Sequence, residues 1–321
     1  MKILITGGAG YIGSVVSEKL QQLGHQLIII DDLRDGKAEA ISTNAVFFQS
    51  DYGNEIVLDK IFSTHPIELV IHLAASANVP DSVIHPLNYY QNNVSGTITL
   101  LKKMEQYQVK KIIFSSTAAV YGNPQFSPIT EIHPLVPVNP YGWSKLFDEQ
   151  IIQDCATSFG LQYFIFRYFC AAGATATHGE SRPSESHLIP LAIDSAIGAR
   201  KQLFVYGNNF DTKDGTGVRD YIHVADIANA HLLAMEAPIE NWNQILNLGT
   251  SKGFSVMEII HATEQLIGQK INYSLAEKRP GDPSSLIASN ERANQLIHWQ
   301  PAYSLTAIIE SAYQWRSNPI Y

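Results

Sequence analysis

The chain has 321 residues, of which 45% are apolar and 16% charged, and its formal net charge at pH 7 is −8. This composition is typical of a globular protein with a sizeable apolar core. The acidic balance argues against nucleic acid or an anionic membrane surface as the main partner. Two cysteines cannot form a disulfide framework, and no spacing of cysteine and histidine predicts a metal site.

The first residues and the apolar runs bear on location. Met1 and Lys2 lead directly into an apolar run that is too short for the core of a signal peptide. The longest apolar runs are also shorter than a membrane span. We therefore expect a cytoplasmic protein without a membrane partner.

In the first half of the chain, short apolar runs alternate with amphipathic stretches. Strands are predicted at 2–6, 26–30, 45–48, 69–72, 111–114 and 162–167. Helices are predicted between them, at 12–23, 55–65, 88–107 and 141–159. This alternation indicates βαβ units and hence an α/β fold with a doubly wound parallel sheet.

Beyond about residue 168 the alternation is looser. A stretch rich in Gly, Ala, Thr and Ser at 171–186 predicts a long loop. Further helices are predicted at 187–198, 224–235, 255–267 and 304–316. We expect two domains, over residues 1–168 and 169–321. The second is smaller and mixed, and segments of it can return to the first.

A glycine-rich turn, with Gly7, Gly10 and Gly13, follows the first predicted strand and opens the first helix. Such glycines allow a tight turn, close approach of the backbone to a pyrophosphate, and close helix–strand packing. Asp31 ends the second strand, where a carboxylate accepts hydrogen bonds from the adenosine ribose and repels a 2′-phosphate. An isolated glycine turn is the alternative, but the flanking strand and helix favour a Rossmann-type domain that binds NAD.

Other residues at strand ends are candidate contacts of the cofactor. Asp51 could bond the adenine or be an ordinary loop acid, and His72 is expected to be a packed core histidine. Leu73, Ala74 and Ala75 suit a backbone that packs against the cofactor. The remaining candidates adjoin the glycine turn or other strand ends: Tyr11, Ile12, Tyr52, Ser115 and Tyr168.

Tyr141 and Lys145 are four residues apart at the start of a predicted helix, so their side chains share one face. An ammonium near the phenol, together with a positive nicotinamide ring, would lower the tyrosine pKa and make Tyr141 a general base. A surface helix is the alternative for such a pair alone. Thr117 ends a strand at the carboxyl edge of the sheet, where ligands bind in open α/β folds.

Several motifs recur in a fixed order along the chain: TGGAGYIG at 6–13, NNVSGT at 92–97, SSTAAVYG at 115–122, NPYGWSK at 139–145, RYF at 167–169, DGTGVRDYIHV at 214–224, NLG at 247–249 and RPGD at 279–282. In this order the sequence resembles the extended short-chain dehydrogenase/reductases, and most closely the UDP-glucose 4-epimerase family. The resemblance implies NAD as cofactor and a UDP-sugar as substrate.

The resemblance also implies a mechanism and site residues. Tyr141 would take the proton of the sugar 4-hydroxyl while C4 gives a hydride to NAD, and the 4-keto sugar would turn before the hydride returns. Thr117 would bond the reacting oxygen, Lys145 the nicotinamide ribose, and Asn92 would lie beside the nicotinamide or sugar. The implied substrate contacts are Arg219 and Arg279 for the diphosphate, Asp282 for the uridine ribose, and Leu188 and Tyr206 for the uracil.

Three features depart from the family pattern. A lysine that some members carry near the nicotinamide phosphates is replaced within residues 75–77, and Leu286 stands at the position that limits the sugar pocket, so N-acetylated sugars are neither clearly admitted nor excluded. Cys170 stands where members usually carry an asparagine that contacts the substrate phosphate, and a thiol is a weak donor. The affinity for the substrate, or its identity, therefore differs here, or Cys170 is a small packing residue.

Several alternatives stay open. UDP-N-acetylhexosamine or a UDP-pentose could be the epimerised substrate, and a non-catalytic NAD sensor could share the fold. A 4,6-dehydratase is disfavoured because Ala118 and Ala119 stand where such enzymes carry an Asp-Glu pair. By family resemblance, the helices at 88–107 and 141–159 pair in a homodimer.

Overall fold

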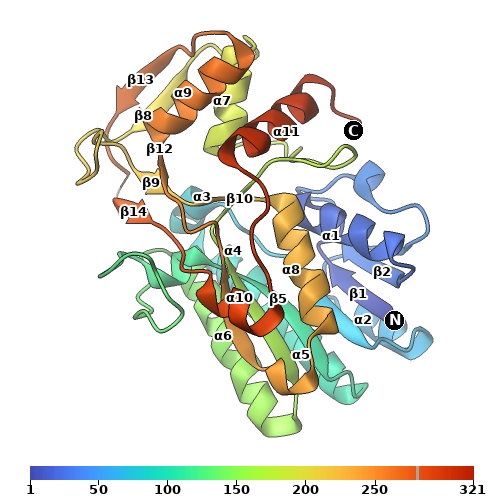
Figure 1. The fold of residues 1–321 in the computed structure, drawn as a ribbon. Helices are drawn as coiled ribbons and strands as arrows, with labels where there is room; N and C mark the ends of the chain where they lie inside the picture. Colours follow the sequence, from blue (N-terminus) through green and yellow to red (C-terminus); the bar gives the residue numbers. More distant parts are fainter. Residues whose placement is uncertain (280–281) are drawn as a thin grey trace.

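The structure is a computed structural model and describes residues 1–279 and 282–321 (Figure 1). Its main feature is a parallel sheet of seven strands in the order β11-β6-β5-β4-β1-β2-β3. These strands are β1 (Lys2–Thr6), β2 (Gln26–Asp31), β3 (Val46–Gln49), β4 (Leu69–His72), β5 (Lys111–Thr117), β6 (Gln162–Tyr168) and β11 (Gln244–Leu248). The chain starts at β1, runs outward to β3, and returns to β4 on the other side of β1. The predicted doubly wound sheet is confirmed.

The helices of the first half connect these strands. They are α1 (Tyr11–Gln22), α2 (Glu55–Thr64), α3 (Val79–Ile84), α4 (Pro86–Tyr89), α5 (Gly96–Gln106) and α6 (Pro140–Phe159). Short helical turns lie at η1 (Ala38–Ala40), η2 (Tyr90–Ser95) and η3 (Ala118–Tyr121).

The sheet separates two apolar cores because successive side chains of a strand point to opposite faces. On β1, Ile3 and Ile5 contribute to one core and Leu4 to the other, and all three side chains are fully buried. A strand that is buried on both faces consists of consecutive apolar residues, which is why apolar runs in the sequence predicted these strands. Helices α1 and α8 (Val224–Glu236) cover the first core, and α2, α5 and α6 cover the second.

The second half builds smaller sheets and a group of helices. The remaining strands are β7 (Cys170–Ala172), β8 (Leu203–Tyr206), β9 (Val218–Arg219), β10 (Tyr221–His223), β12 (Phe254–Ser255), β13 (Tyr273–Ala276) and β14 (Ser285–Leu286). They form a β10-β7 pair, a β13-β8 pair and a β12-β9-β14 sheet. The remaining helices are α7 (Leu188–Ala196), α9 (Val256–Ile267), α10 (Glu291–Ile297) and α11 (Leu305–Ser317), with the turn η4 (Ile239–Asn241).

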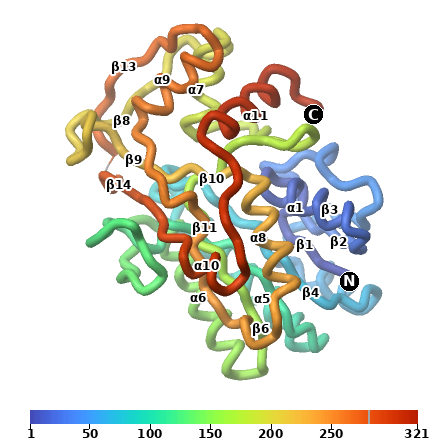
Figure 2. The backbone as a smooth tube through the Cα atoms, viewed as in Figure 1, coloured from blue at the N-terminus to red at the C-terminus, as the bar shows by residue number. Residues whose placement is uncertain are grey.

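Two segments of the second half return to the main sheet. Strand β11 pairs with β6, with Leu246 opposite Phe166, and α8 packs against α1. Figure 2 shows this excursion in orange, between the yellow and red parts of the second half. The division into domains at residue 168 stays a prediction, although β11 and α8 extend the first core.

The predicted helix at 88–107 is the largest difference from expectation. It is divided into α4, a π-helical turn over η2, and α5. The phenol of Tyr52 donates to the carbonyl oxygen of Asn92 inside this turn. Gly96 follows against the same ring, where a Cβ would lie 2.9 Å from the ring atoms. The wide turn thus fits around Tyr52, and π turns of this kind are common at functional sites.

Among the described residues, no helix is long and apolar enough to cross a membrane.

Candidate active site

The glycine turn lies between the end of β1 and the start of α1. Gly7 has a φ of +73°, and a Cβ there would lie 2.6 Å from the amide nitrogen of Ala74. A Cβ on Gly13 would lie 2.0 Å from the Gly7 carbonyl oxygen, so close packing requires this glycine. A Cβ on Gly10 would meet only that same oxygen among the described atoms, at 3.4 Å. Gly10 therefore leaves open space at the N-terminus of α1, which fits a pyrophosphate.

Asp31 lies beside this turn at the end of β2. Its Oδ2 accepts a hydrogen bond from the Ala9 amide at 3.0 Å, and its Oδ1 accepts one from the Leu33 amide at 2.9 Å. Burial raises the pKa of Asp31, and these two backbone bonds oppose the rise. A carboxylate has about four acceptor sites, so Asp31 keeps capacity for ribose hydroxyls.

The other side of the groove is formed by the end of β4. His72 is buried between the hydroxyls of Thr6 and Thr97, at 2.6 and 2.9 Å, as expected of a packed histidine. The amide of Leu73 donates to the Thr6 carbonyl oxygen at 3.1 Å, and that of Ala74 to the Thr6 hydroxyl at 3.2 Å. The chain from Leu73 to Ala75 is thereby fixed against Gly7.

Asn93 is a site residue that the sequence interpretation missed in favour of its neighbour Asn92. Its side chain accepts from the Ser76 amide at 2.8 Å and donates to the Ser76 carbonyl oxygen at 3.1 Å. Its amide also donates to the hydroxyl of Ser144 at 2.9 Å. Asn93 thus joins the loop after β4, the π turn and α6, and the NNVSGT motif was the signal that contained it.

The predicted catalytic residues come together at the ends of β5 and α6. Asn139 caps α6, and its Oδ1 accepts from the Gly142 amide, which fixes where the helix starts. Tyr141 lies close enough to Thr117 for the threonine side chain to lower the pKa of the phenol. Lys145 is buried one turn later, with its Nζ 4.5 Å from the centroid of the Phe114 ring.

The pKa of Tyr141 is governed mainly by burial. Burial raises it, and the protein's own opposing contributions come from Thr117 and the charge of Arg182. Lys145 is not among them, and the prediction that its ammonium and the nicotinamide charge together lower this pKa stays a prediction. Burial lowers the pKa of Lys145 to about 8, although the charges of Asp148 and Glu149 oppose this.

A buried polar network lies directly behind these residues. Glu149 of α6 holds Arg167 of β6 through two bonds, at 3.0 and 2.6 Å, and both side chains are 1% exposed. Ser116 of β5 donates to the same carboxylate. Arg167 also donates to the hydroxyl of Tyr121 at 2.9 Å. The network joins the elements that carry Thr117, Tyr141 and Tyr168. Apart from the motifs, no pattern in the sequence indicated these contacts.

The second half of the chain forms a pocket of about 240 Å³. Its lining includes the first helical residue, Tyr11, and the residues that the resemblance implies as contacts of the nucleotide part of the substrate: Cys170, Leu188, Tyr206, Arg219, Arg279 and Asp282. Thr117, Tyr141 and Lys145 are outside the described lining. The pocket therefore gathers residues from separate segments of the second half beside one residue of the glycine turn.

Individual lining residues show how the pocket is built. The guanidinium of Arg279 lies 3.9 Å from the centroid of the Tyr206 ring, and that of Arg219 donates to the Val218 carbonyl oxygen at 2.8 Å. Burial raises the pKa of the Cys170 thiol to about 11, so it is an uncharged group at neutral pH. Pro280 and Gly281 of the RPGD motif lie outside the described residues.

The remaining predicted cofactor contacts also lie near strand ends. Tyr168 is buried, with its hydroxyl 3.0 Å from Nε2 of His231, and forms a side-chain hydrogen bond with Ser115. Asp51 accepts from the Gly53 amide at 2.6 Å. Ile12 is partly buried against the first core.

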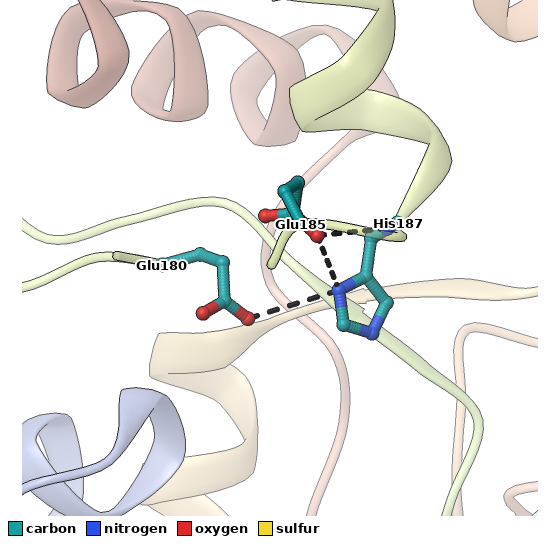
Figure 3. A group of neighbouring side chains, drawn as sticks. All are labelled: Glu180, Glu185 and His187. Carbon is teal, nitrogen blue, oxygen red and sulfur yellow. Dashed lines mark hydrogen bonds and ion pairs between the residues drawn. The ribbon is translucent and has the colours of Figure 1, made fainter. Parts of the chain in front are cut away.

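Glu180 and His187 of the pocket lining form a cluster with Glu185 (Figure 3). Nδ1 of His187 lies 2.9 Å from Oε1 of Glu185 and 3.8 Å from Oε2 of Glu180. Arg182 lies 2.9 Å from the same Glu180 oxygen, so a guanidinium of the chain already offsets this charge.

Comparisons with known proteins agree with this arrangement. The model of the NAD dependent epimerase/dehydratase family matches residues 3–249. UDP-glucose 4-epimerase of Halalkalibacterium halodurans is 48% identical over 319 residues, which cover 98% of this chain and 95% of that protein. The enzyme of Lacticaseibacillus casei is 42% identical over 322 residues, covering 99% and 97%.

Solved structures give the same result. UDP-glucose 4-epimerase from Bifidobacterium longum, in complex with NAD+ and UDP, has a TM-score of 0.95 and 35% identity, and the match covers 99% of this chain and 98% of that chain. This chain therefore belongs to the NAD dependent epimerase/dehydratase family and, within it, to the UDP-glucose 4-epimerases.

Proposed function

We propose that the chain inverts C4 of a UDP-hexose, interconverting UDP-glucose and UDP-galactose through a 4-keto intermediate. The observation that carries this proposal is that Thr117 and Tyr141 lie together at the carboxyl edge of the sheet, in a chain that also has a pocket lined by two arginines. Bound NAD supplies the hydride acceptor and donor. The open face of Gly10 and the carboxylate of Asp31 lie where its pyrophosphate and adenosine ribose would be held.

Tyr141 is the general base and acid in this proposal. Its phenol would remove the proton from the sugar 4-hydroxyl, and Thr117 would hold the reacting oxygen in line with it. Burial raises the pKa of Tyr141, and Thr117 and the charge of Arg182 oppose this only in part, so a further positive charge would favour the phenolate. The fixed charge of an oxidised nicotinamide beside Tyr141 would lower this pKa only when the site is ready for hydride transfer.

The pocket residues would hold the nucleotide and leave the sugar free to turn. Arg219 and Arg279 carry guanidiniums that suit a diphosphate, and the Tyr206 ring offers a face to the uracil. Leu188 would pack beside the uracil, and Asp282 would accept hydrogen bonds from the ribose. Cys170 would contact the phosphate side as an uncharged group.

A homodimer is also part of the proposal. Large apolar side chains are exposed on α6, where Trp143 is 36% and Phe147 44% exposed, and on α3 and α4, where Ile84 is 70% and Leu87 78% exposed. Pairing of these helices with those of a second copy would bury them. We also propose a cytoplasmic location, in keeping with the free thiols of Cys155 and Cys170.

The test is turnover by the purified protein without added cofactor. UDP-galactose should yield UDP-glucose, and Tyr141→Phe should lower kcat by about 10²–10⁴-fold while NAD remains bound. Tyr273→Phe, which changes an exposed tyrosine of β13, is the matched control. A protein that binds NAD but converts neither UDP-hexose nor UDP-N-acetylhexosamine nor UDP-xylose would be a sensor, and the proposal would be wrong.

A further inference from the structure

The segment 173–180, which follows β7, crosses the outer side of α1 next to the glycine turn. At its start, the phenol of Tyr11 donates to the Gly173 carbonyl oxygen at 2.6 Å. Further along, Glu18 of α1 accepts hydrogen bonds from the hydroxyls of Thr175 and Thr177. The Nδ1 atom of His178 lies 3.4 Å from the same carboxylate. The segment is therefore attached to the helix that begins at the dinucleotide site.

The same segment reaches the loop that follows Asp31. The Nε2 atom of His178 lies 3.2 Å from the Ala40 carbonyl oxygen. This loop packs on the glycine turn, since the Lys37 amide donates to the Ala9 carbonyl oxygen at 3.1 Å. Segment 173–180 thus connects α1, which begins at the glycine turn, with the loop that follows Asp31.

The C-terminus holds this segment from the outside. The ring of Tyr321 lies 4.9 Å from that of Trp315 and 6.0 Å from that of His178, measured between centroids. Burial raises the pKa of Tyr321, and hydrogen bonds with Ser14 of α1 and the backbone of Gly179 oppose the rise. In Figure 2 the red C-terminal end lies beside the yellow-green segment, above α1.

Trp315 of α11 completes these contacts. Its indole Nε1 donates to the Glu180 carbonyl oxygen at 3.1 Å. Its ring lies against Gly179 so closely that a Cβ there would be 2.5 Å from the ring. Glycine is therefore required where the segment passes under α11, and the last helix of the chain is joined to the first.

We propose that segment 173–180 and Tyr321 form a clasp that retains NAD in its groove between catalytic cycles. This inference rests on the proposed function, in which NAD is regenerated at each turnover and has no need to leave. A dinucleotide held by the N-terminus of α1 and by Asp31 would contact the two elements that this segment connects, so its release would be easier when the segment is detached from them. Contacts that attach the segment add to the barrier for release and act mainly on the dissociation rate.

The first test removes the outer contact. Tyr321→Ala should release NAD about tenfold faster, because it removes the ring contacts with Trp315 and His178. The measurement is the NAD that stays with the protein after successive gel filtrations at 25 °C. Ile320→Ala is the matched control, because this neighbour is 64% exposed. UDP affinity should be equal in both variants.

A second variant opens the clasp from the other side. Glu18→Gln weakens the attachment of segment 173–180 to α1. The increase in the NAD release rate of the double variant should not exceed the product of the two single increases, because both substitutions act on one segment. Unchanged NAD release in both single variants would overturn the clasp, even if their Tm values fall. Since this assay follows only NAD, it gives its answer whether or not the protein converts UDP-sugars.

Discussion

The buried pair of Glu149 and Arg167 allows a sharp prediction about stability. Glu149→Gln keeps the shape of the side chain but removes the charge that two guanidinium bonds, at 3.0 and 2.6 Å, are made to. Burial disfavours the charged guanidinium, but the hydrogen bonds and charge of Glu149 outweigh this and raise the pKa of Arg167. In the variant, Arg167 stays charged and loses its counterion, although the arginine is only 1% exposed to solvent.

The size of the effect follows from burial. Removing one partner of a buried ion pair costs about 3–5 kcal/mol of unfolding free energy. The entropy of unfolding is about 2.1 cal/mol/K per residue, or about 0.7 kcal/mol/K for this chain. The loss therefore corresponds to a fall in Tm of roughly 4–8 °C.

Thermal melting of the NAD-loaded proteins, followed by circular dichroism, measures this fall. The control is Glu149→Leu combined with Arg167→Met, which removes both charges and should be less destabilised than Glu149→Gln. A Tm of Glu149→Gln within about 1 °C of the wild type would refute the reasoning, because it would mean that the buried guanidinium needs no counterion. kcat should also fall, since Ser116 next to Thr117 loses its carboxylate partner.

Three further predictions follow from the site and its surroundings. Gly13→Ala should lower Tm and abolish NAD binding, because its Cβ would lie 2.0 Å from an oxygen, whereas Gly10→Ala should keep its Tm and lose NAD affinity in titrations. Burial lowers the pKa of His231 to about 4, so the unfolded chain gains a proton below about pH 6.5 that the native chain does not. Stability is then lost as pH falls from about 6.5 to 4, amounting to about 2 kcal/mol between pH 7 and 5 in urea titrations, and His231→Gln should remove that part. Arg279→Met should raise KM for the UDP-sugar about 10–100-fold with a smaller change in kcat, while exposed Lys201→Met should not.

The parts of the fold that the sequence predicted are those with local signals. Strand β1, the glycine turn and α1 follow one another within about one βαβ unit, so periodicity and glycine spacing suffice. Strand β11 was missed because it lies beyond the regular strand–helix alternation of the first half and is defined by its pairing with the distant β6. The π turn was missed because its shape depends on the Tyr52 phenol, which comes from another loop.

The residues of the site also divide into those with a local sequence signal and those without one. Gly7, Gly10 and Asp31 are recognisable from spacing, because backbone geometry around a phosphate demands them. The pocket residues come from separate segments, so no local pattern unites them, and only the family resemblance selected Arg219 and Arg279. The pKa of Tyr141 could not be read from the Tyr-x-x-x-Lys spacing, because it depends on burial and on where the lysine charge lies.

The proposed reacting groups and the proposed nucleotide contacts stand on different parts of the fold. This difference suggests how an enzyme can hold a nucleotide while its sugar turns. The reacting groups stand on β5 and α6, which the Glu149–Arg167 network joins to β6 inside the main sheet. Of the proposed nucleotide contacts, Arg219 stands on β9 and Tyr206 on β8, outside that sheet. Substitutions in the buried network should therefore change kcat and stability together, whereas those in the smaller sheets should change substrate affinity first. This division lets the pocket adapt to a substrate, as at Cys170, without displacing Thr117 or Tyr141.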